Sequence, residues 1–239
     1  MNLAKWTPAC AVLLFLGIGF PIAKSEPAPD ASGELSRVVA QMDRTAADFH
    51  TTQANFVWQQ YTKVIDEVSD TQKGTVYFRR SGQNVEMAAD VNDPSPPKYV
   101  LFTGNKVEMY QPKINQVTQY NTGKDRGAFE SFLVLGFGGS GQDMLKAFEV
   151  TYLGSEKVTD IDTVKLNLVP KSEKARGTFN HIWLWVDPAR GVSLRQQLFE
   201  PDGDYRLADY SDVQLNQKIP DSVFKLKTNS KTKFLSPKG

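Results

Sequence analysis

The stretch FLVLGFGGSGQDMLKAF, residues 132–148, determines which fold the chain can adopt. An apolar run leads into a glycine-rich loop and then into a helical pattern. Gly136, Gly138 and Gly141 match the spacing G-x-G-x-x-G of dinucleotide-binding loops, and Asp160 follows at about the distance where such sites carry an acid. The loop therefore belongs either to a nucleotide site or to a flexible joint.

Segments with alternating apolar and polar residues lie on both sides of this stretch. Alternation with a period of two indicates strands, and turn sequences such as VDPARG and EPDGDY separate them as in consecutive hairpins. About eleven short strands result, which predicts a mainly β fold, an unclosed antiparallel β-barrel. A dinucleotide fold needs parallel strands joined by crossover helices, so we expect the glycines to form a joint.

The N-terminus has the features of an export signal. Lys5 precedes a short apolar run, and Ser25 is a small residue in front of the expected cleavage site. The run is too short to span a bilayer. We expect residues 1–25 to be a signal peptide, residues 26–34 a flexible leader, and residues 35–239 one domain that ends in a basic tail. The mature protein is then expected in the periplasm.

One amphipathic helix is expected after the leader. Apolar residues in 32–47 recur three and four positions apart, which is the spacing of one helix face. Ser32 is the expected N-cap.

Composition excludes several classes of function. Removal of residues 1–25 takes away two lysines and no acid, and leaves 26 basic and 27 acidic side chains. This balance argues against nucleic acid as a partner. Cys10 is the single cysteine, and His50 and His181 are the only histidines. We therefore expect no metal, no cofactor and no catalytic site, so that the protein is not an enzyme.

Two strands are apolar on both faces. In HIWLWVD, residues 181–187, isoleucine, leucine and valine alternate with histidine and two tryptophans, and KYVLFTG behaves similarly. Either helices or a second sheet cover both faces, or a curved sheet surrounds an apolar cavity. On the second interpretation the predicted cavity residues are Phe56, Trp58, Tyr77, Tyr99, Leu101, Met109, Trp183 and Trp185.

The segment around the glycine loop is apolar enough to cover such a cavity as a helical lid. The predicted lid residues are Phe129, Phe132, Leu133, Leu135, Phe137, Met144, Leu145 and Phe148. The predicted hinge residues are Gly136, Gly138, Gly139 and Gly141, whose flexibility would let the lid leave. A purely structural pair of core helices is the alternative.

Short motifs in this order resemble the LolA family of periplasmic lipoprotein carriers. GNKVEMYQPKINQV, residues 104–117, is similar to a strand pair of that family, and GTVYFRR, residues 74–80, resembles its glycine-started strand. ANFVWQQ and IPDSVFKL resemble its first and closing strands. The resemblance implies a half-barrel with a helical lid over a hydrophobic cavity, and it places the family's lid-latching arginine at Arg80.

The same resemblance implies a monomeric carrier. Its cargo would be acylated lipoproteins, taken from an inner-membrane ABC transporter complex and delivered to an outer-membrane acceptor. The sequence departs from the family pattern at Ser81, Glu108 and Trp58, which leaves the cargo open. A carrier of free lipid or glycolipid, and a lipid-sensing regulatory module on the same fold, are the alternatives.

Overall fold

The computed structural model describes residues 30–82, 84–121 and 135–236. In chain order the elements are α1 (Ala31–Ala47), β1 (Thr51–Thr62), β2 (Glu67–Ser81), β3 (Asn84–Asp93), β4 (Lys98–Thr103), β5 (Lys106–Gln111), η1 (Pro112–Ile114), β6 (Gln116–Asn121), α3 (Gly141–Ala147), β7 (Phe148–Val158), β8 (Ile161–Pro170), α4 (Glu173–Arg176), β9 (His181–Asp187), β10 (Val192–Phe199), β11 (Tyr205–Leu215), η3 (Asp221–Phe224) and β12 (Lys233–Leu235).

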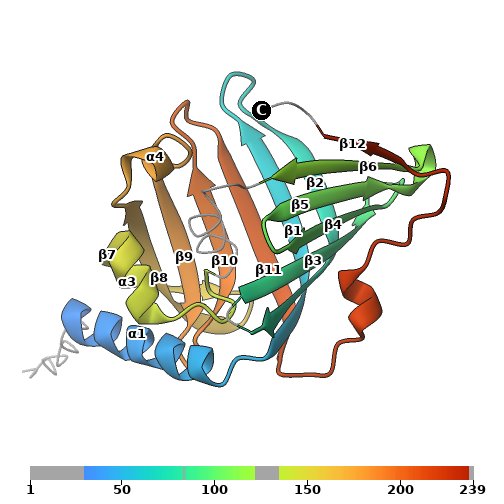
Figure 1. The fold of residues 1–239 in the computed structure, drawn as a ribbon. Coiled ribbons are helices and arrows are strands. Elements are labelled where there is room, and N and C mark those ends of the chain that lie inside the picture. The colour runs from blue at the N-terminus through green and yellow to red at the C-terminus, as the bar shows by residue number, and fades with distance from the viewer. Residues whose placement is uncertain (1–29, 83, 122–134, 237–239) are drawn as a thin grey trace, which may run out of the picture.

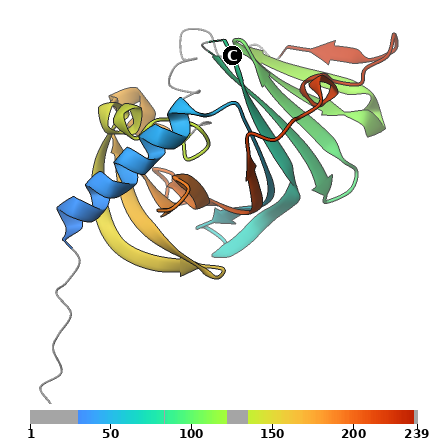
Figure 2. The same cartoon turned by 90° about the horizontal axis from the view of Figure 1, so that it is seen from below.

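All described strands belong to one sheet that does not close. Its order is β12-β6-β5-β4-β3-β2-β1-β11-β10-β9-β8-β7, and the pairs are antiparallel except for β12 and β6 (Figure 1). The sheet bends round so that its two ends stay apart (Figure 2). This confirms the predicted mainly β, unclosed antiparallel barrel, with twelve strands where about eleven were expected.

The two turns singled out in the sequence close hairpins as predicted. In VDPARG the carboxylate of Asp187 accepts the backbone N–H of Ala189 at 2.9 Å, and the N–H of Gly191 donates to the Asp187 carbonyl at 2.8 Å. Gly191 has φ +65° and Gly203 of EPDGDY has φ +94°, a region that favours glycine. Local turn chemistry therefore fixes the register of these hairpins.

Helix α1 begins slightly earlier than the sequence indicated. Asp30, not Ser32, is the N-cap, and its carboxylate accepts the backbone N–H of Ser32 at 3.1 Å. Aspartate and serine cap helices about equally well, so the pattern alone did not separate them. Residues 31–34, predicted to be leader, are helical. None of the helices that the structure describes is long and apolar enough to cross a bilayer.

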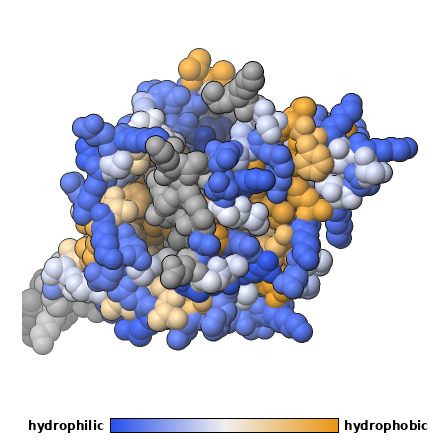
Figure 3. Space-filling view, viewed as in Figure 1, coloured by the Kyte–Doolittle hydropathy of each residue, from blue (hydrophilic) through white to orange (hydrophobic). Residues whose placement is uncertain are grey.

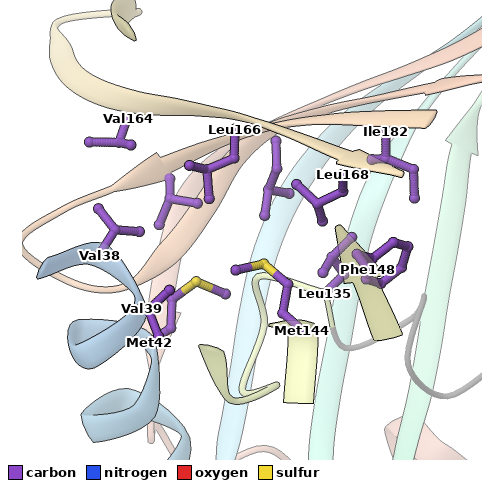
Figure 4. Close-up of a cluster of buried hydrophobic side chains, with 12 residues drawn as sticks. Val38, Val39, Met42, Leu135, Met144, Phe148, Val164, Leu166, Leu168 and Ile182 are labelled. Carbon is purple, nitrogen blue, oxygen red and sulfur yellow. The ribbon is translucent and has the colours of Figure 1, made fainter. Parts of the chain in front are cut away.

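The largest apolar cluster lies between the helices and one end of the sheet (Figure 4). Val38, Val39 and Met42 of α1 face β8 and β9, with Met144 of α3 beside them. An amphipathic helix is stable only when its apolar stripe is covered, so α1 is held by this contact.

A C-terminal segment, residues 216–235, covers part of the other face of the sheet. Phe224 packs against Ala88 and Leu101, and the guanidinium of Arg79 lies 4.1 Å from the centre of its ring. The segment ends in β12, which pairs with β6. Part of the expected loose basic tail is therefore a strand.

Large apolar side chains are exposed mainly at two places. Val64 and Ile65 form the tip of the β1–β2 hairpin, visible at the top of Figure 3, and Tyr120, Phe234 and Leu235 lie at the β6–β12 edge. Figure 3 also shows hydrophobic areas right of the centre and at the left, within a surface that is otherwise largely hydrophilic.

Truncation of Phe224 tests the role of the C-terminal segment. Phe224 is 5% exposed, so Phe224→Ala should lower the free energy of unfolding by about 3 kcal/mol. Phe234, in the same segment but 55% exposed, is the matched control, and Phe234→Ala should cost less than about 0.5 kcal/mol. Urea denaturation measures both; equal costs would mean that the segment does not stabilise the sheet.

Candidate functional site

The strand register assigns each side chain to one of two faces. We call the face that packs against α1 and α3 the concave face and the opposite one the convex face (Figure 2). Residues directly opposite in an antiparallel pair share a face, so Trp58, Ala208 and Gln196 lie on one side. Gln196 donates a hydrogen bond to Leu135, which identifies this side as the concave face.

Three of the eight predicted cavity residues lie on the concave face. Phe56 packs against the cluster that contains Phe137, and Trp58 is two residues further along β1. Met109 of β5 lies in one row of paired residues that runs across β4 and β3 to Val76 of β2. Val76 belongs to the same cluster, so Met109 is on the concave face. These three remain candidate ligand contacts.

The other five lie on the convex face, which corrects the expectation that all eight share one cavity. They are Tyr77, Tyr99, Leu101, Trp183 and Trp185. Tyr77 and Leu101 are covered by the C-terminal segment. The two tryptophans lie beneath Lys165, whose Nζ is 4.2 and 4.5 Å from their ring centres. The C-terminal segment therefore covers the part of the convex face around Leu101, and Lys165 packs over the part around the two tryptophans.

The described part of the predicted lid, residues 135–148, is called the lid segment below. Of the predicted lid residues that it contains, Leu135, Phe137, Met144 and Phe148 are buried and Leu145 is half-buried. Phe129, Phe132 and Leu133 lie outside the described residues. Ser140 caps α3, accepting the N–H of Asp143 at 3.0 Å, so the helix is only the seven residues Gly141–Ala147.

Phe137 anchors the lid segment to the middle of the concave face. Its ring stacks on Phe78 with centres 5.1 Å apart and meets Tyr210 edge-on at 4.6 Å. Burial, with a smaller contribution from Asp209, raises the pKa of Tyr210. The Tyr210 hydroxyl therefore stays protonated, and the contact remains uncharged.

Two hydrogen bonds from β10 hold the start of the lid segment. The side-chain amide of Gln196 donates to the Leu135 carbonyl at 2.6 Å, and the backbone N–H of Ser193 donates to the Gly136 carbonyl at 2.9 Å. Gln196 is 8% exposed, a buried polar group with a partner. Sequence reasoning missed it, because nothing distinguishes it from Gln197 on the opposite face.

The glycines of the lid segment have a packing role that the sequence did not reveal. A Cβ on Gly136 would lie 2.3 Å from the Ser193 side chain, and one on Gly138 would lie 2.4 Å from the Phe49 ring. Both glycines have positive φ, +79° and +90°. Their close approach to the sheet and to Phe49 requires glycine irrespective of any hinge motion, so the hinge stays a prediction.

A pocket of about 690 Å³ lies between the lid segment, α1 and the β2–β3 hairpin. Its apolar lining is Met42, Val85, Leu135, Met144 and Phe148, and its polar lining includes Asp43, Arg80, Gln142, Asp143 and Lys146. This volume is in the range of small-molecule sites. The two kinds of side chain make it suitable for an amphiphile.

Arg80 lines this pocket and contacts the end of α1. Its Nε donates to the Phe49 carbonyl at 3.1 Å and its Nη2 to the Ala46 carbonyl at 3.2 Å. A cation is favourable at a helix C-terminus. None of these bonds reaches the lid segment, and residues 129–134 of the predicted lid lie outside the described residues, so the latch role of Arg80 stays a prediction.

The other charged groups of the pocket have local partners. Asp143 accepts a hydrogen bond from Lys146 at 2.8 Å, which lowers the pKa of Asp143, and Ser140 adds to the effect. Asp43 accepts the backbone N–H of Gln142 at 3.0 Å. Among the described residues, His, Cys, Asp and Glu side chains form no group that could hold a metal ion.

Comparison with protein families matches residues 47–227 to the family described as outer membrane lipoprotein carrier protein LolA. The comparison with curated protein sequences gives no match.

Two solved structures with TM-scores of 0.50 or more share the fold at low identity, and a third is given for comparison. An uncharacterized conserved protein from Thermus thermophilus is 13% identical with a TM-score of 0.51, over 87% of this chain and 99% of that one. MucB is 12% identical with a TM-score of 0.50, over 87% of this chain and 66% of that one. A LolA superfamily protein, NE2245 from Nitrosomonas europaea, is 14% identical with a TM-score of 0.39, over 80% and 97%.

A methyl group on Gly138 tests the docking of the lid segment. Gly138→Ala should lower the free energy of unfolding by about 2–4 kcal/mol, because the new Cβ meets the Phe49 ring and φ is positive. Gly104 also has positive φ but has open space around it, so Gly104→Ala should cost about 1 kcal/mol. Thermal denaturation compares the two; an equal cost would mean that the loop does not dock on Phe49.

Proposed function

We propose that this chain, which belongs to the LolA family of outer membrane lipoprotein carrier proteins, is a carrier that binds acyl chains in the pocket beneath the lid segment. The observation that carries the proposal is the pocket itself, placed between α1, the β2–β3 hairpin and a lid segment that β10 holds through two hydrogen bonds. A binding role fits this site better than catalysis, because the carboxylates that line it, Asp43 and Asp143, are already paired with backbone and with Lys146.

Burial of acyl chains supplies the affinity that such a carrier needs. Each buried methylene contributes about 0.8 kcal/mol. Met42, Val85 and Phe148 offer apolar surface to a chain, and Phe56 and Trp58 extend this surface along the concave face. An acyl chain in this environment is kept out of water while the carrier diffuses.

The proposed setting is the periplasm of a bacterium with two membranes. Residues 1–25 direct export, and the carrier crosses the aqueous space as a monomer. On the family pattern, the cargo comes from an inner-membrane ABC transporter complex and goes to an outer-membrane acceptor. The cargo is a lipoprotein or a free lipid, and both share the acyl chains that the pocket recognises.

Entry of a chain requires the lid segment to move. Its apolar contacts and its two hydrogen bonds from β10 fill part of the concave face. We propose that Gln196 holds the closed position and that ligand chains replace Phe137 between Phe78 and Tyr210. Gly139 and the neighbouring glycines then provide the hinge.

Binding of an acylated peptide tests the proposed function. A lipoprotein N-terminal peptide with its acyl chains should bind, and the same peptide without them should not. Val85→Trp fills the pocket and should weaken binding by roughly tenfold or more. Thr71→Trp, on the convex face of β2, is the matched control and should leave affinity unchanged. Absence of binding by the acylated peptide and by free lipids would refute the carrier function.

Removal of the Gln196 side-chain amide tests whether its hydrogen bond keeps the lid segment in the closed position. Gln196→Leu leaves the Leu135 carbonyl without its donor, so the amides of the lid segment should exchange hydrogen roughly tenfold faster, and ligand should enter faster. Gln197→Leu is the control, because its side chain points to the convex face. Hydrogen–deuterium exchange with stopped-flow binding measures both effects; unchanged exchange in Gln196→Leu would remove this residue from lid closure.

A further inference from the structure

Two consecutive arginines of β2 point to opposite faces of the sheet and have different partners. On the convex face, Arg79 is neutralised by two carboxylates: its Nε lies 2.5 Å from Glu86 and its Nη1 lies 2.6 Å from Asp221. On the concave side, Arg80 makes no ion pair with any residue that the structure describes. Within the described part of the chain, the charge of Arg79 is therefore compensated and that of Arg80, at the pocket, is not.

Arg80 is fixed in position and still has donors to offer. A guanidinium has five N–H groups. The two side-chain bonds of Arg80, to the carbonyls of Ala46 and Phe49, use two of them, and the group lies 5.5 Å from the centre of the Phe49 ring. These contacts orient the side chain, and its other three donors have no partner among the residues that the structure describes.

The carboxylates that line the pocket do not compete for this charge. Asp143 pairs with Lys146, and Asp43 accepts from the backbone of Gln142. The same pocket has apolar lining residues, Val85 and Phe148 among them. A guanidinium binds carboxylate or phosphate through charge-assisted hydrogen bonds, and apolar walls bind a hydrocarbon chain.

We propose that the ligand of this pocket is an amphiphile with an anionic head, a carboxylate or a phosphate, which accepts hydrogen bonds from Arg80 while its chain lies against the apolar walls. The inference rests on the proposed function and narrows it. A fully acylated lipoprotein N-terminus has no anion beside its chains, so the preferred cargo is an anionic lipid.

Probes that share one chain and differ in the head test this inference. Dodecanoate, dodecyl phosphate and dodecanol are titrated by calorimetry into the full mature protein and into three variants, Arg80→Gln, Arg80→Lys and Arg79→Gln. The unmodified protein should bind an anionic probe roughly tenfold or more tightly than dodecanol. Whichever of the two anions binds more tightly identifies the head group as carboxylate or phosphate.

The three variants test whether the preference for anionic probes over dodecanol comes from Arg80. Arg80→Gln should remove the preference and keep dodecanol binding, Arg80→Lys should retain part of it, and Arg79→Gln should retain all of it. Equal affinity for the three probes in the unmodified protein, or an unchanged preference in Arg80→Gln, would overturn the anionic head and leave the acyl carrier intact. If no probe binds and the acylated peptide also fails, the proposed function fails as well.

Discussion

An open sheet must have both of its faces covered if both are apolar, and this requirement shapes the whole molecule. A closed barrel would bury its interior by itself, but here β7 and β12 are the two ends of the sheet. The concave face is therefore covered by α1 and the lid segment, and part of the convex face by the C-terminal segment. Exposure of either apolar face to water is unfavourable, so the folded state needs these covers as well as the strands.

The two covers of the sheet differ in how they are held. The C-terminal segment is attached through Phe224, an ion pair from Arg79 and the strand β12. The lid segment lacks a ladder of strand hydrogen bonds and depends on Phe137, two hydrogen bonds from β10 and the short helix α3. Segments with few backbone contacts open at lower free energy than strands within a sheet. On the proposed function, the concave cover is thus the one that a ligand displaces.

Sequence patterns predict well which residues form strands, but they predict poorly which face of the sheet each side chain occupies. Alternation and turn residues such as Gly191 and Gly203 predicted the hairpins, because both signals are local. Which face of a strand lines a cavity depends on distant segments: Trp183 and Trp58 have the same residue type and similar surroundings in sequence, yet they lie on opposite faces. Gln196 was missed for the same reason, since its partner Leu135 is 61 residues away.

The strength of the lid contacts sets the size of ligand that can replace them. Two hydrogen bonds contribute about 1 kcal/mol each, and burial of Phe137 contributes about 2–3 kcal/mol. Together these contacts contribute about 4–5 kcal/mol. Burial of one methylene contributes about 0.8 kcal/mol, so a chain must bury about six methylenes before displacement of the lid is favourable. Short metabolites do not reach this threshold, whereas the fatty chains of membrane lipids exceed it. On the proposed carrier function, a closed but displaceable lid would therefore select long chains without any specific contact to them.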